Sequence, residues 1–487
     1  MNRLLLLLLP LLLTNCSTPG SSTSPGDTAE DRGVGDTLAD SDRHDAAPDT
    51  LPRVETLEEV AISGLVVIQN PANVLSFYVE WETDALATTE LHVECGDGDT
   101  IDLTDDLLRS KHRAFVMGFW EGANCQVVAR STDAAGSVGQ LVAPLEVGAL
   151  PDFLPALDLQ VRKPNKMQGG WTLFNLTNDF DEPPLLVVMV DDQGRYRWYH
   201  QRATNDPGSD TDTRTVPGGV LIGGTHGKVK PAFVDWEGSV LWDKWMNVHH
   251  DFRPIGDEGH WLMLTDNEGC GQIPHGGIVF EYDRFTDSKV WEWYACAHIA
   301  PEEPWQDWSH LNSVSLWPDG EHLLISSRNL NGIFKVEYPS GEVVWELNGG
   351  GGDFAWEDGD DRFWGQHDPE VQPDSTHILL YDNGLEGERE WSRVLELEID
   401  EDAKTVKKVW EYRPDPDIFT PIWGDADRQP NGNTLITFGA RSKKEHTQLV
   451  EVTPDKEQVW RLVPPLKWGV YRSERVVNPV RGYLRSD

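Results

Sequence analysis

Residues 332–345 read GIFKVEYPSGEVVW: an apolar strand, a polar turn, and a second strand that ends at a tryptophan. The same pattern recurs at 185–198, 231–242, 277–291, 393–410 and 449–460. The six terminal tryptophans are Trp198, Trp242, Trp291, Trp345, Trp410 and Trp460. Their spacing of roughly 50 residues is the length of one propeller blade with its loops. The period predicts an all-β chain whose main part is a six-bladed β-propeller.

A second apolar strand precedes most of these hairpins and follows a turn rich in Pro, Gly or Asp. PDGEHLLISSR at 318–328 and PNGNTLITFG at 430–439 are two examples. Each repeat therefore holds about four strands, which is the number expected of a propeller sheet. The inner strands of such a sheet end near the central channel, so we expect the ligand site there.

Three of the repeats carry a histidine at the start of an inner segment. The motifs are HHDFRP with His250, SHLNSV with His310 and GQHDPEV with His367, whereas a later repeat has Gly424 and Asp425. Because the repeat places these positions at equivalent points of neighbouring blades, the three histidines are expected to converge on one mouth of the channel. His249 competes with His250 for this position, but the shared His-Asp pair aligns His250 with His367.

The composition limits the classes of partner. The chain has 487 residues, with 82 Asp plus Glu against 41 Lys plus Arg, a formal net charge of −41. Such a surface repels phosphate backbones, so no nucleic acid partner is expected. We interpret the charge as a solubility feature. The length predicts two domains.

The first 16 residues, MNRLLLLLLPLLLTNC, are typical of an export signal, because the apolar run is too short to span a membrane. Cys16 resembles the lipidated cysteine of a lipoprotein, although Asn15 departs from the usual small residue at that position. Ser17 does not indicate retention at the inner membrane. Residues 17–55 are polar and rich in Ser, Thr, Pro and Gly, which predicts a disordered tether. We therefore expect an exported protein that touches the membrane only through its lipid anchor, on the outer membrane.

Residues 56–150 contain short alternating strands separated by turn residues. Trp81, which follows one such strand, and CQVVARSTDAAG at 125–136 resemble a fibronectin type III or immunoglobulin-like domain. The resemblance implies a small β-sandwich of about 90 residues before a propeller at 155–487. No chemistry is assigned to the sandwich.

Export also places four further cysteines in an oxidising compartment. Proximity in the sequence favours the pairs Cys95–Cys125 and Cys270–Cys296, among three possible connectivities. Four free buried thiols are the alternative. In either case their role is structural, because the chain has no CxxC motif.

A family resemblance joins the histidine motifs. DWSHLNSV at 307–314 is followed, 18 residues after His310, by Arg328 in LLISSRN. Together with GQHDPEV and HHD, these segments resemble the bacterial arylsulfate sulfotransferases, over roughly residues 160–465. That family consists of exported six-bladed propellers that move a sulfuryl group between phenols, without a nucleotide donor or other cofactor.

The resemblance implies a role for each matching residue. His367 is expected to carry the sulfuryl group, His310 and Arg328 to hold the sulfate, and His250 to act as an acid/base or positioning residue. These roles are chemically consistent: a neutral imidazole is nucleophilic, and a guanidinium stabilises negative charge on the transferred group. We expect Trp308, Trp364 and Asn312 to contact the substrate.

Two other functions fit the same residues. The propeller can be a non-catalytic surface protein that binds a ligand or a protein through its channel face. Alternatively, the histidines can bind a metal ion with Asp251 and Asp368, because imidazole and carboxylate form a common ligand set. Arg328 argues against a metal, since a guanidinium beside a dication is unfavourable.

Overall fold

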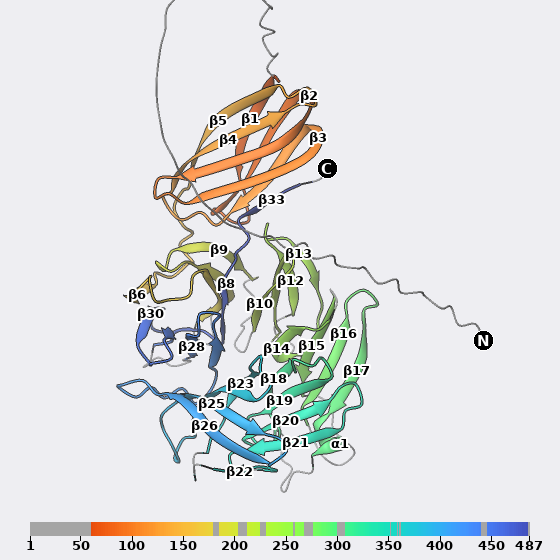
Figure 1. Cartoon of the computed structure of the whole chain (residues 1–487), viewed down its shortest axis with the longest axis vertical. Coiled ribbons are helices and arrows are strands. Elements are labelled where there is room, and N and C mark those ends of the chain that lie inside the picture. The colour runs from red at the N-terminus through yellow and green to blue at the C-terminus, as the bar shows by residue number, and fades with distance from the viewer. Residues whose placement is uncertain are drawn as a thin grey trace, which may run out of the picture. The chain divides into compact units, whose positions relative to one another are not determined.

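The computed structural model describes residues 60–178, 185–202, 212–224, 230–256, 259–266, 276–299, 307–350, 352–357, 359, 362–439 and 446–485. The predictions for the export signal, Cys16 and the tether lie outside these residues. The described chain is all-β, apart from the short helix α1 (Ala295–His298), and belongs to one unit, Leu57–Asp487 (Figure 1). None of its helices has the length and apolar character needed to cross a membrane.

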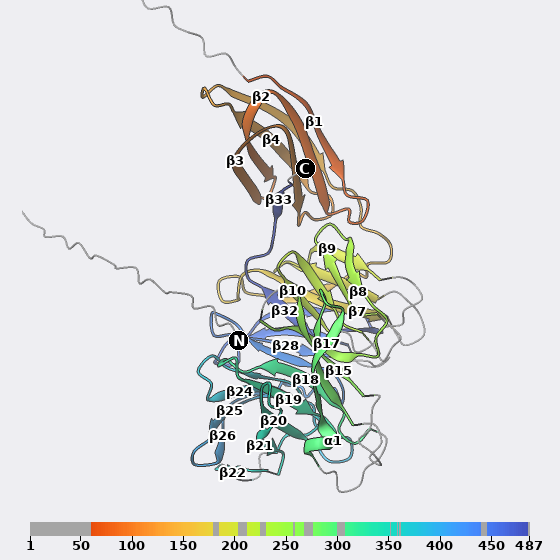
Figure 2. The same ribbon diagram turned by 90° about the vertical axis from the view of Figure 1, so that its right-hand side faces the viewer.

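The first sheet combines the two ends of this unit. Its hydrogen-bonded order is β33-β3-β2-β4-β5, and β1 pairs with β2. The strands are β1 (Ile62–Gln69), β2 (Ser76–Cys95), β3 (Thr100–Met117), β4 (Asn124–Thr132), β5 (Val138–Glu146) and β33 (Gly482–Leu484). Figure 2 shows β33, near the C-terminus, beside β3. The last residues of the chain therefore belong to the sheet that the first described strands begin.

Alternating residues of β2 form the core of this sheet. Phe77, Val79 and Trp81 are buried, and the Trp81 indole donates a hydrogen bond to Ser131 Oγ at 3.1 Å. Cys95 and Cys125 lie directly opposite each other on β2 and β4 and form a disulfide, as predicted. For the second predicted pair, Cys296 is disulfide-bonded and Cys270 lies outside the described residues.

All six tryptophan hairpins predicted from the repeat are present. They are β8 (Leu185–Val190) with β9 (Tyr196–Gln201), β12 (Ala232–Asp235) with β13 (Val240–Asp243), β16 (Ile278–Asp283) with β17 (Ser288–Tyr294), β20 (Gly332–Glu337) with β21 (Val343–Asn348), β25 (Arg393–Asp400) with β26 (Thr405–Tyr412), and β29 (Gln448–Val452) with β30 (Gln458–Val463). In every hairpin the repeated tryptophan lies on the second strand, at a β-bulge. A bulge increases the local twist of a strand pair, so the six sheets share one local geometry.

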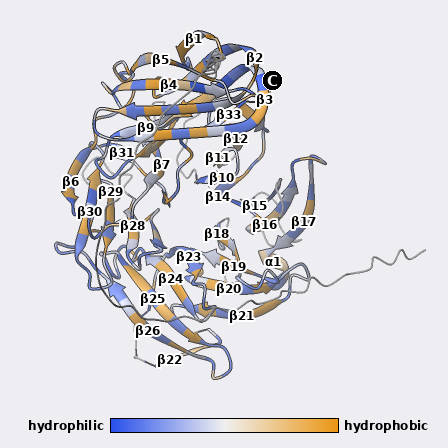
Figure 3. Ribbon diagram, turned by 45° about the horizontal axis from the view of Figure 1, so that its top comes forward, coloured by the Kyte–Doolittle hydropathy of each residue, from blue (hydrophilic) through white to orange (hydrophobic). Residues whose placement is uncertain are grey.

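Five of these sheets begin with two further strands. They are β10 (Thr213–Val216) with β11 (Gly219–Ile222), β14 (His249–Pro254) with β15 (His260–Thr265), β18 (Leu311–Leu316) with β19 (His322–Ser327), β23 (His367–Val371) with β24 (His377–Asp382), and β27 (Asp425–Arg428) with β28 (Thr434–Phe438). In Figure 3 the strands β10, β14, β18 and β23 lie toward the middle, and β17, β21, β26 and β30 lie farther out. The segments with the histidine motifs are therefore the innermost strands, one strand further in than the apolar segments recognised in the sequence.

The remaining strands join distant parts of the chain. The sheet of β7 (Trp171–Asn178), β8 and β9 is completed by β31 (Trp468–Gly469) and β32 (Ser473–Val476). Conversely, β6 (Asp158–Arg162) pairs with β30 in the last sheet, and β22 (Ala355–Trp356) extends the sheet of β26. The first and last sheets of the repeat therefore exchange strands.

Several of the repeated tryptophans also connect neighbouring sheets. The indole N–H of Trp198 donates to the carbonyl of Trp236, that of Trp410 to Pro454, and that of Trp460 to Asp192, at 2.8–3.0 Å. Each acceptor lies in or beside the hairpin turn of another sheet. The bond from Trp460 connects the last sheet to the first.

Candidate functional site

The predicted histidines lie where the innermost strands begin. β14 begins with His249 and His250, His310 immediately precedes β18, and β23 begins at His367. The backbone is left-handed at His250 (φ 60°), His310 (φ 41°) and Asp368 (φ 42°). Non-glycine residues in this conformation cost roughly 1–3 kcal/mol each and concentrate at functional sites. The surrounding fold therefore holds all three motifs in a strained local conformation.

The structure brings the three histidines together around a tyrosine. The ring centroids of His250 and His310 are 4.9 Å apart. The ring of Tyr471, which is fully buried, lies 6.0 Å from His250 and 6.5 Å from His367. His250 Nδ1 also contacts His249 Nδ1 at 2.6 Å. His250 is thus in contact with both His310 and Tyr471.

His367 is held as a neutral imidazole of defined tautomer. Burial, followed by the charge of Arg328, lowers its pKa to about 3. Its Nδ1 lies 2.7 Å from Asn383 Oδ1 and 3.0 Å from the carbonyl oxygen of Gly365. Both partners are acceptors, because the amide nitrogen of Asn383 donates to the carbonyls of Thr420 and Trp423. Nδ1 therefore carries the proton, and the lone pair of Nε2 is available.

Arg328 is a partly buried guanidinium with only neutral hydrogen-bond acceptors. Nη1 donates to Asn329 Oδ1 at 2.9 Å and Nη2 to the carbonyl of Pro421 at 3.0 Å, whereas Nε has no partner within the described chain. Burial lowers its pKa, and the nearest opposing charge is Asp307. The Asp307 carboxylate accepts a hydrogen bond from His310 Nδ1 at 2.7 Å instead. A cation beside His367 is therefore left without a paired anion.

The three residues expected to contact substrate lie in different environments. Asn312 is fully buried; its side chain donates to the carbonyl of Gln366 at 2.7 Å. Trp308 is 2% exposed and packs in the hydrophobic core between two sheets. Trp364 is partly exposed, and the guanidinium of Arg389 lies 5.3 Å from its ring centroid. Of the three, Trp364 is therefore the side chain that solvent reaches.

A buried ion cluster adjoins the histidines. We define it as Arg214, Arg253 and Arg472 with the six carboxylates Asp212, Asp251, Asp368, Glu370, Asp425 and Asp427. Asp251 and Asp368 directly follow His250 and His367. Asp368 binds Arg253, and Asp251 lies 3.1 Å from Arg472 Nη1. The two His-Asp motifs thus place their carboxylates in one cluster.

The cluster has more carboxylates than guanidinium groups, and its pKa values reflect this. Burial and neighbouring carboxylates raise the pKa of Asp425 and Asp427 well above the usual range. Burial also raises the pKa of Asp212 to about 6. For Asp368, burial acts in the same direction, but Arg253 and Arg472 overcome it and lower its pKa. The cluster therefore retains protons on some carboxyls, because three guanidinium groups cannot balance six buried negative charges.

Sequence reasoning missed three residues of this region: Asn383, Tyr471 and Arg472. Arg472 donates to the carbonyl of Asn312 at 2.8 Å, and its guanidinium lies 4.9 Å from the Tyr471 ring. The available signal was the alternating segment YRSERV at 471–476, which follows the last hairpin and contains β32 at its end.

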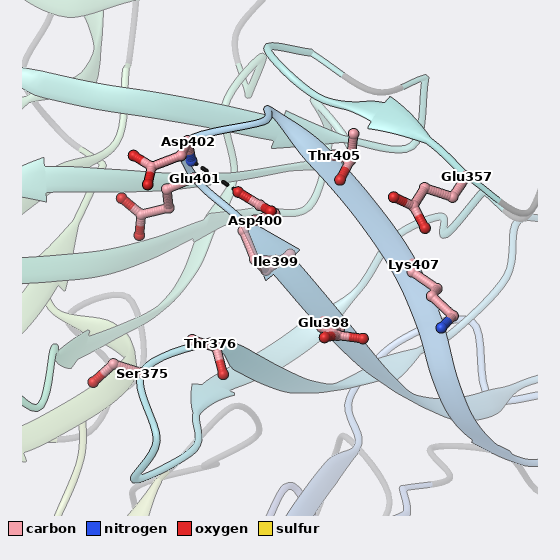
Figure 4. A pocket seen from close by; sticks show the side chains of 10 residues that line it. All are labelled: Glu357, Ser375, Thr376, Glu398, Ile399, Asp400, Glu401, Asp402, Thr405 and Lys407. Atoms are coloured by element: carbon pink, nitrogen blue, oxygen red, sulfur yellow. Dashed lines mark hydrogen bonds between the residues drawn. The ribbon is translucent and has the colours of Figure 1, made fainter.

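Other parts of the described structure do not form a comparable site. No group of three or more His, Cys, Asp or Glu side chains within the described ranges is arranged to hold a metal ion. A cavity of ≈570 Å³ lies on the outer hairpin β25–β26 and does not include the histidines (Figure 4). Its lining is mostly acidic: Glu357, Glu398, Asp400, Glu401 and Asp402 with Lys407.

Comparison with solved structures gives matches of low identity. A Bacteroides caccae protein of unknown function has a TM-score of 0.43 and 11% identity over 63% of this chain and 98% of its own. A putative 6-phosphogluconolactonase from Bacteroides fragilis has a TM-score of 0.37 and 12% identity, over 82% and 98%. The periplasmic gluconolactonase PpgL of Pseudomonas aeruginosa has a TM-score of 0.36 and 13% identity, over 82% and 99%.

Sequence comparison gives a family. The arylsulfate sulfotransferase AssT of Escherichia coli O6:H1 is 26% identical over 28% of this chain, and the matched part spans 28% of that relative. The sequence model of the arylsulfotransferase (ASST) family matches residues 159–463, a segment that contains all six tryptophan hairpins, the three histidines and Arg328. The chain therefore belongs to the arylsulfotransferase family.

Proposed function

We propose that this protein transfers a sulfuryl group from an aryl sulfate donor to a phenolic acceptor, without a nucleotide, through a sulfated His367. The observation that carries the proposal is the state of this side chain. His367 is neutral, its Nδ1 proton is engaged by Asn383 and Gly365, and Arg328 is the largest charge acting on it. Family membership supports aryl sulfotransfer as the reaction class.

The first half-reaction forms the covalent intermediate. The Nε2 lone pair of His367 attacks sulfur, an N–S bond forms, and the bond between sulfur and the aryl oxygen breaks. The electron pair of that bond leaves with the aryl group as a phenolate. His250 or His310 donates a proton to this oxygen, since imidazole titrates in the range that acid/base transfer near neutral pH requires.

The second half-reaction reverses these steps with the acceptor. The phenol oxygen attacks sulfur, its proton passes to the histidine that had acted as acid, and the N–S bond breaks, which restores neutral His367. In both steps negative charge develops on the sulfuryl oxygens. The free Nε–H of Arg328 and its unpaired positive charge suit stabilisation of that charge.

The proposal also assigns the remaining predicted parts. The six hairpin sheets form a closed six-bladed propeller, as the bond from Trp460 to Asp192 and the strand exchange by β6 and β32 support. The domain of residues 56–150 is a sandwich that spaces the enzyme from its membrane. Cys16 is the lipid-anchored cysteine of an exported lipoprotein, and Cys270 pairs with Cys296. Asn312, Trp308 and Trp364 complete the substrate site.

Incubation with a chromogenic aryl sulfate and a phenol tests the reaction. We expect a sulfated phenol as product, and rapid quenching with donor alone should give a peptide containing His367 with one added SO₃ group. Wild-type protein that gives neither product nor sulfated peptide would refute the function. A saturable rise in melting temperature without turnover would then favour the alternative, a surface propeller that only binds its ligand.

A further inference from the structure

A second incompletely paired guanidinium, Arg389, contacts the ring of Trp364, which lies three residues before His367 in the chain. Nη2 of Arg389 donates to the carboxylate of Asp382. The side chain is only 9% exposed, yet Nε and Nη1 have no hydrogen-bond partner within the described ranges. Burying such donors without acceptors costs roughly 1–3 kcal/mol. An explanation is therefore needed for their position.

The need to neutralise Asp382 does not explain why these donors are buried. Asp382 also accepts a hydrogen bond from Arg393 Nε at 2.8 Å and one from the backbone N–H of Trp364 at 2.9 Å. One guanidinium is already sufficient to balance this carboxylate. Burial lowers the pKa of Arg389, against the pull of Asp382, and the charge of Arg393 lowers it further. Asp382 and Glu411 both act on the charge of Arg389, yet its Nε and Nη1 donors remain unused within the described residues.

Two contacts connect Arg389 to residues that precede the partners of His367 in the chain. Its guanidinium lies 5.3 Å from the centroid of the Trp364 ring, and it shares Asp382 with the Trp364 backbone. Trp364 and Asp382 immediately precede Gly365 and Asn383, the two residues that hold His367 Nδ1. The Arg389 guanidinium therefore lies beside the ring of a residue that directly precedes the segment holding His367. Trp364 is also the predicted aryl-binding side chain that solvent reaches.

We propose that Arg389 binds an acidic substituent on the aryl ring of the substrate while that ring packs on Trp364. The substrate class is then phenols, and the corresponding aryl sulfates, that carry a carboxylate on the ring. This inference extends the proposed function, because it names the substrate that the same site selects. A carboxylate supplies the acceptor that these donors of Arg389 lack, and charge-assisted hydrogen bonds to guanidinium groups are among the strongest.

The test compares two acceptors of similar size, 4-hydroxybenzoate and 4-methylphenol, with wild-type protein and Arg389→Gln. Wild-type protein should have a kcat/KM at least about tenfold higher for the carboxylated phenol, and Arg389→Gln should abolish this preference by lowering transfer to 4-hydroxybenzoate far more than transfer to 4-methylphenol. Arg389→Lys keeps the charge and should retain part of the preference. An unchanged ratio in both variants would overturn the proposal.

Arg413 provides the matched control. Its guanidinium packs on the Trp391 ring, as that of Arg389 does, at 3.7 and 4.3 Å, but it is fully paired with Asp417. Arg413→Gln should leave the acceptor ratio unchanged. If it shifts the ratio as much as Arg389→Gln, the effect comes from packing around Trp391 and the proposal is wrong.

Calorimetric titration with 4-hydroxybenzoate separates this inference from the reaction itself. Wild-type protein should bind the carboxylated phenol, and Arg389→Gln should bind it at least about tenfold more weakly, whether or not turnover occurs. Arg389-dependent binding without transfer would refute the proposed function and retain this inference. Transfer without any preference for the carboxylate would do the reverse. Melting curves identify a variant that fails to fold, in which case Arg389→Lys decides the outcome.

Discussion

Arginine has opposite surroundings in two adjoining regions of this protein. In the buried ion cluster, Arg472 contacts three carboxylates, and its pKa is raised well above the usual value. Within the described part of the chain, Arg328 beside His367 has no carboxylate hydrogen-bond partner, Arg389 shares its one carboxylate partner with Arg393, and the pKa values of both are lowered. The number of carboxylates around the guanidinium therefore differs between the two regions. We propose that a guanidinium surrounded by carboxylates stabilises the fold, and that one with few carboxylates is available for an anion that arrives from outside.

The largest expected effect is the loss of the nucleophile from the histidine region. His367→Ala should lower aryl sulfate turnover by at least about 10³-fold, because no other group can carry the sulfuryl. His377→Ala is the control, since this histidine lies on the next strand of the same sheet and pairs with the exposed Asp374. If His367→Ala keeps its turnover, His367 is not the nucleophile, and the arginines near it do not identify the catalytic site.

The comparison itself is tested by neutralising one arginine of each kind. Arg328→Gln should lower kcat/KM by roughly 10²–10³-fold and change the melting temperature little, since it leaves no carboxylate unpaired. Arg472→Gln should instead destabilise the fold by about 3–5 kcal/mol, because Asp251 and Asp368 lose a partner. Denaturant unfolding and steady-state kinetics on both variants measure the contrast. Equal losses of stability would remove the distinction.

A smaller effect is expected from the group that sets the tautomer of His367. Asn383→Leu removes one acceptor from Nδ1, while the Gly365 carbonyl remains. One net hydrogen bond is worth about 1 kcal/mol, so kcat/KM for the donor should fall roughly tenfold at most. Yield of sulfated His367 after rapid quenching measures the same step. If the yield is unchanged while turnover falls, Asn383 acts elsewhere in the cycle.

The smallest effect concerns the pH dependence of the ion cluster. Because the pKa of Asp425 is raised in the folded state, the folded protein keeps a proton that the unfolded chain releases above about pH 4. The free energy of unfolding therefore falls as pH rises from about 4 toward the raised pKa of Asp425 in the folded state. Asp425→Asn cannot ionise, so its free energy of unfolding should fall less between pH 6 and 9, by about 1 kcal/mol.

Asp417→Asn is the control for this measurement. Asp417 is paired with Arg413, and its pKa is lowered, so it stays ionised in both states above pH 6. Its substitution should leave the slope of stability against pH unchanged in that range. The same slope in wild-type protein and Asp425→Asn would mean that the cluster holds its proton on another carboxyl.

The sequence was most informative where one residue type repeats. Tryptophan at a fixed place in a hairpin predicted all six hairpins, because the bulge that receives this side chain is part of each local strand pair. The repeated histidine motifs predicted that His250, His310 and His367 would lie together for the same reason: equivalent positions of neighbouring sheets face one region. The sequence period therefore predicted both the six hairpins and the position of the three histidines.

The sequence period could not reveal Tyr471 and Arg472, because they lie on a chain segment outside the repeat. Tyr471 and Arg472 reach the histidines only because β32 pairs with β7, almost 300 residues earlier in the chain. Asn383 is recognisable only when its carbonyl oxygen is seen to face His367. The unused donors of Arg389 likewise depend on which acceptors are missing nearby, and a sequence does not show that.

The pairing of β32 with β7 has a consequence for biosynthesis. A polypeptide emerging N-terminus first contains His250, His310 and His367 well before it contains Tyr471 and Arg472. Until that late segment docks, Asp251 and Asp368 lack one of their three guanidinium partners, and the rings of His250 and His367 lack their common neighbour. The region around the histidines therefore reaches the arrangement described above only after residues 471–476 have been synthesised and β32 has paired with β7.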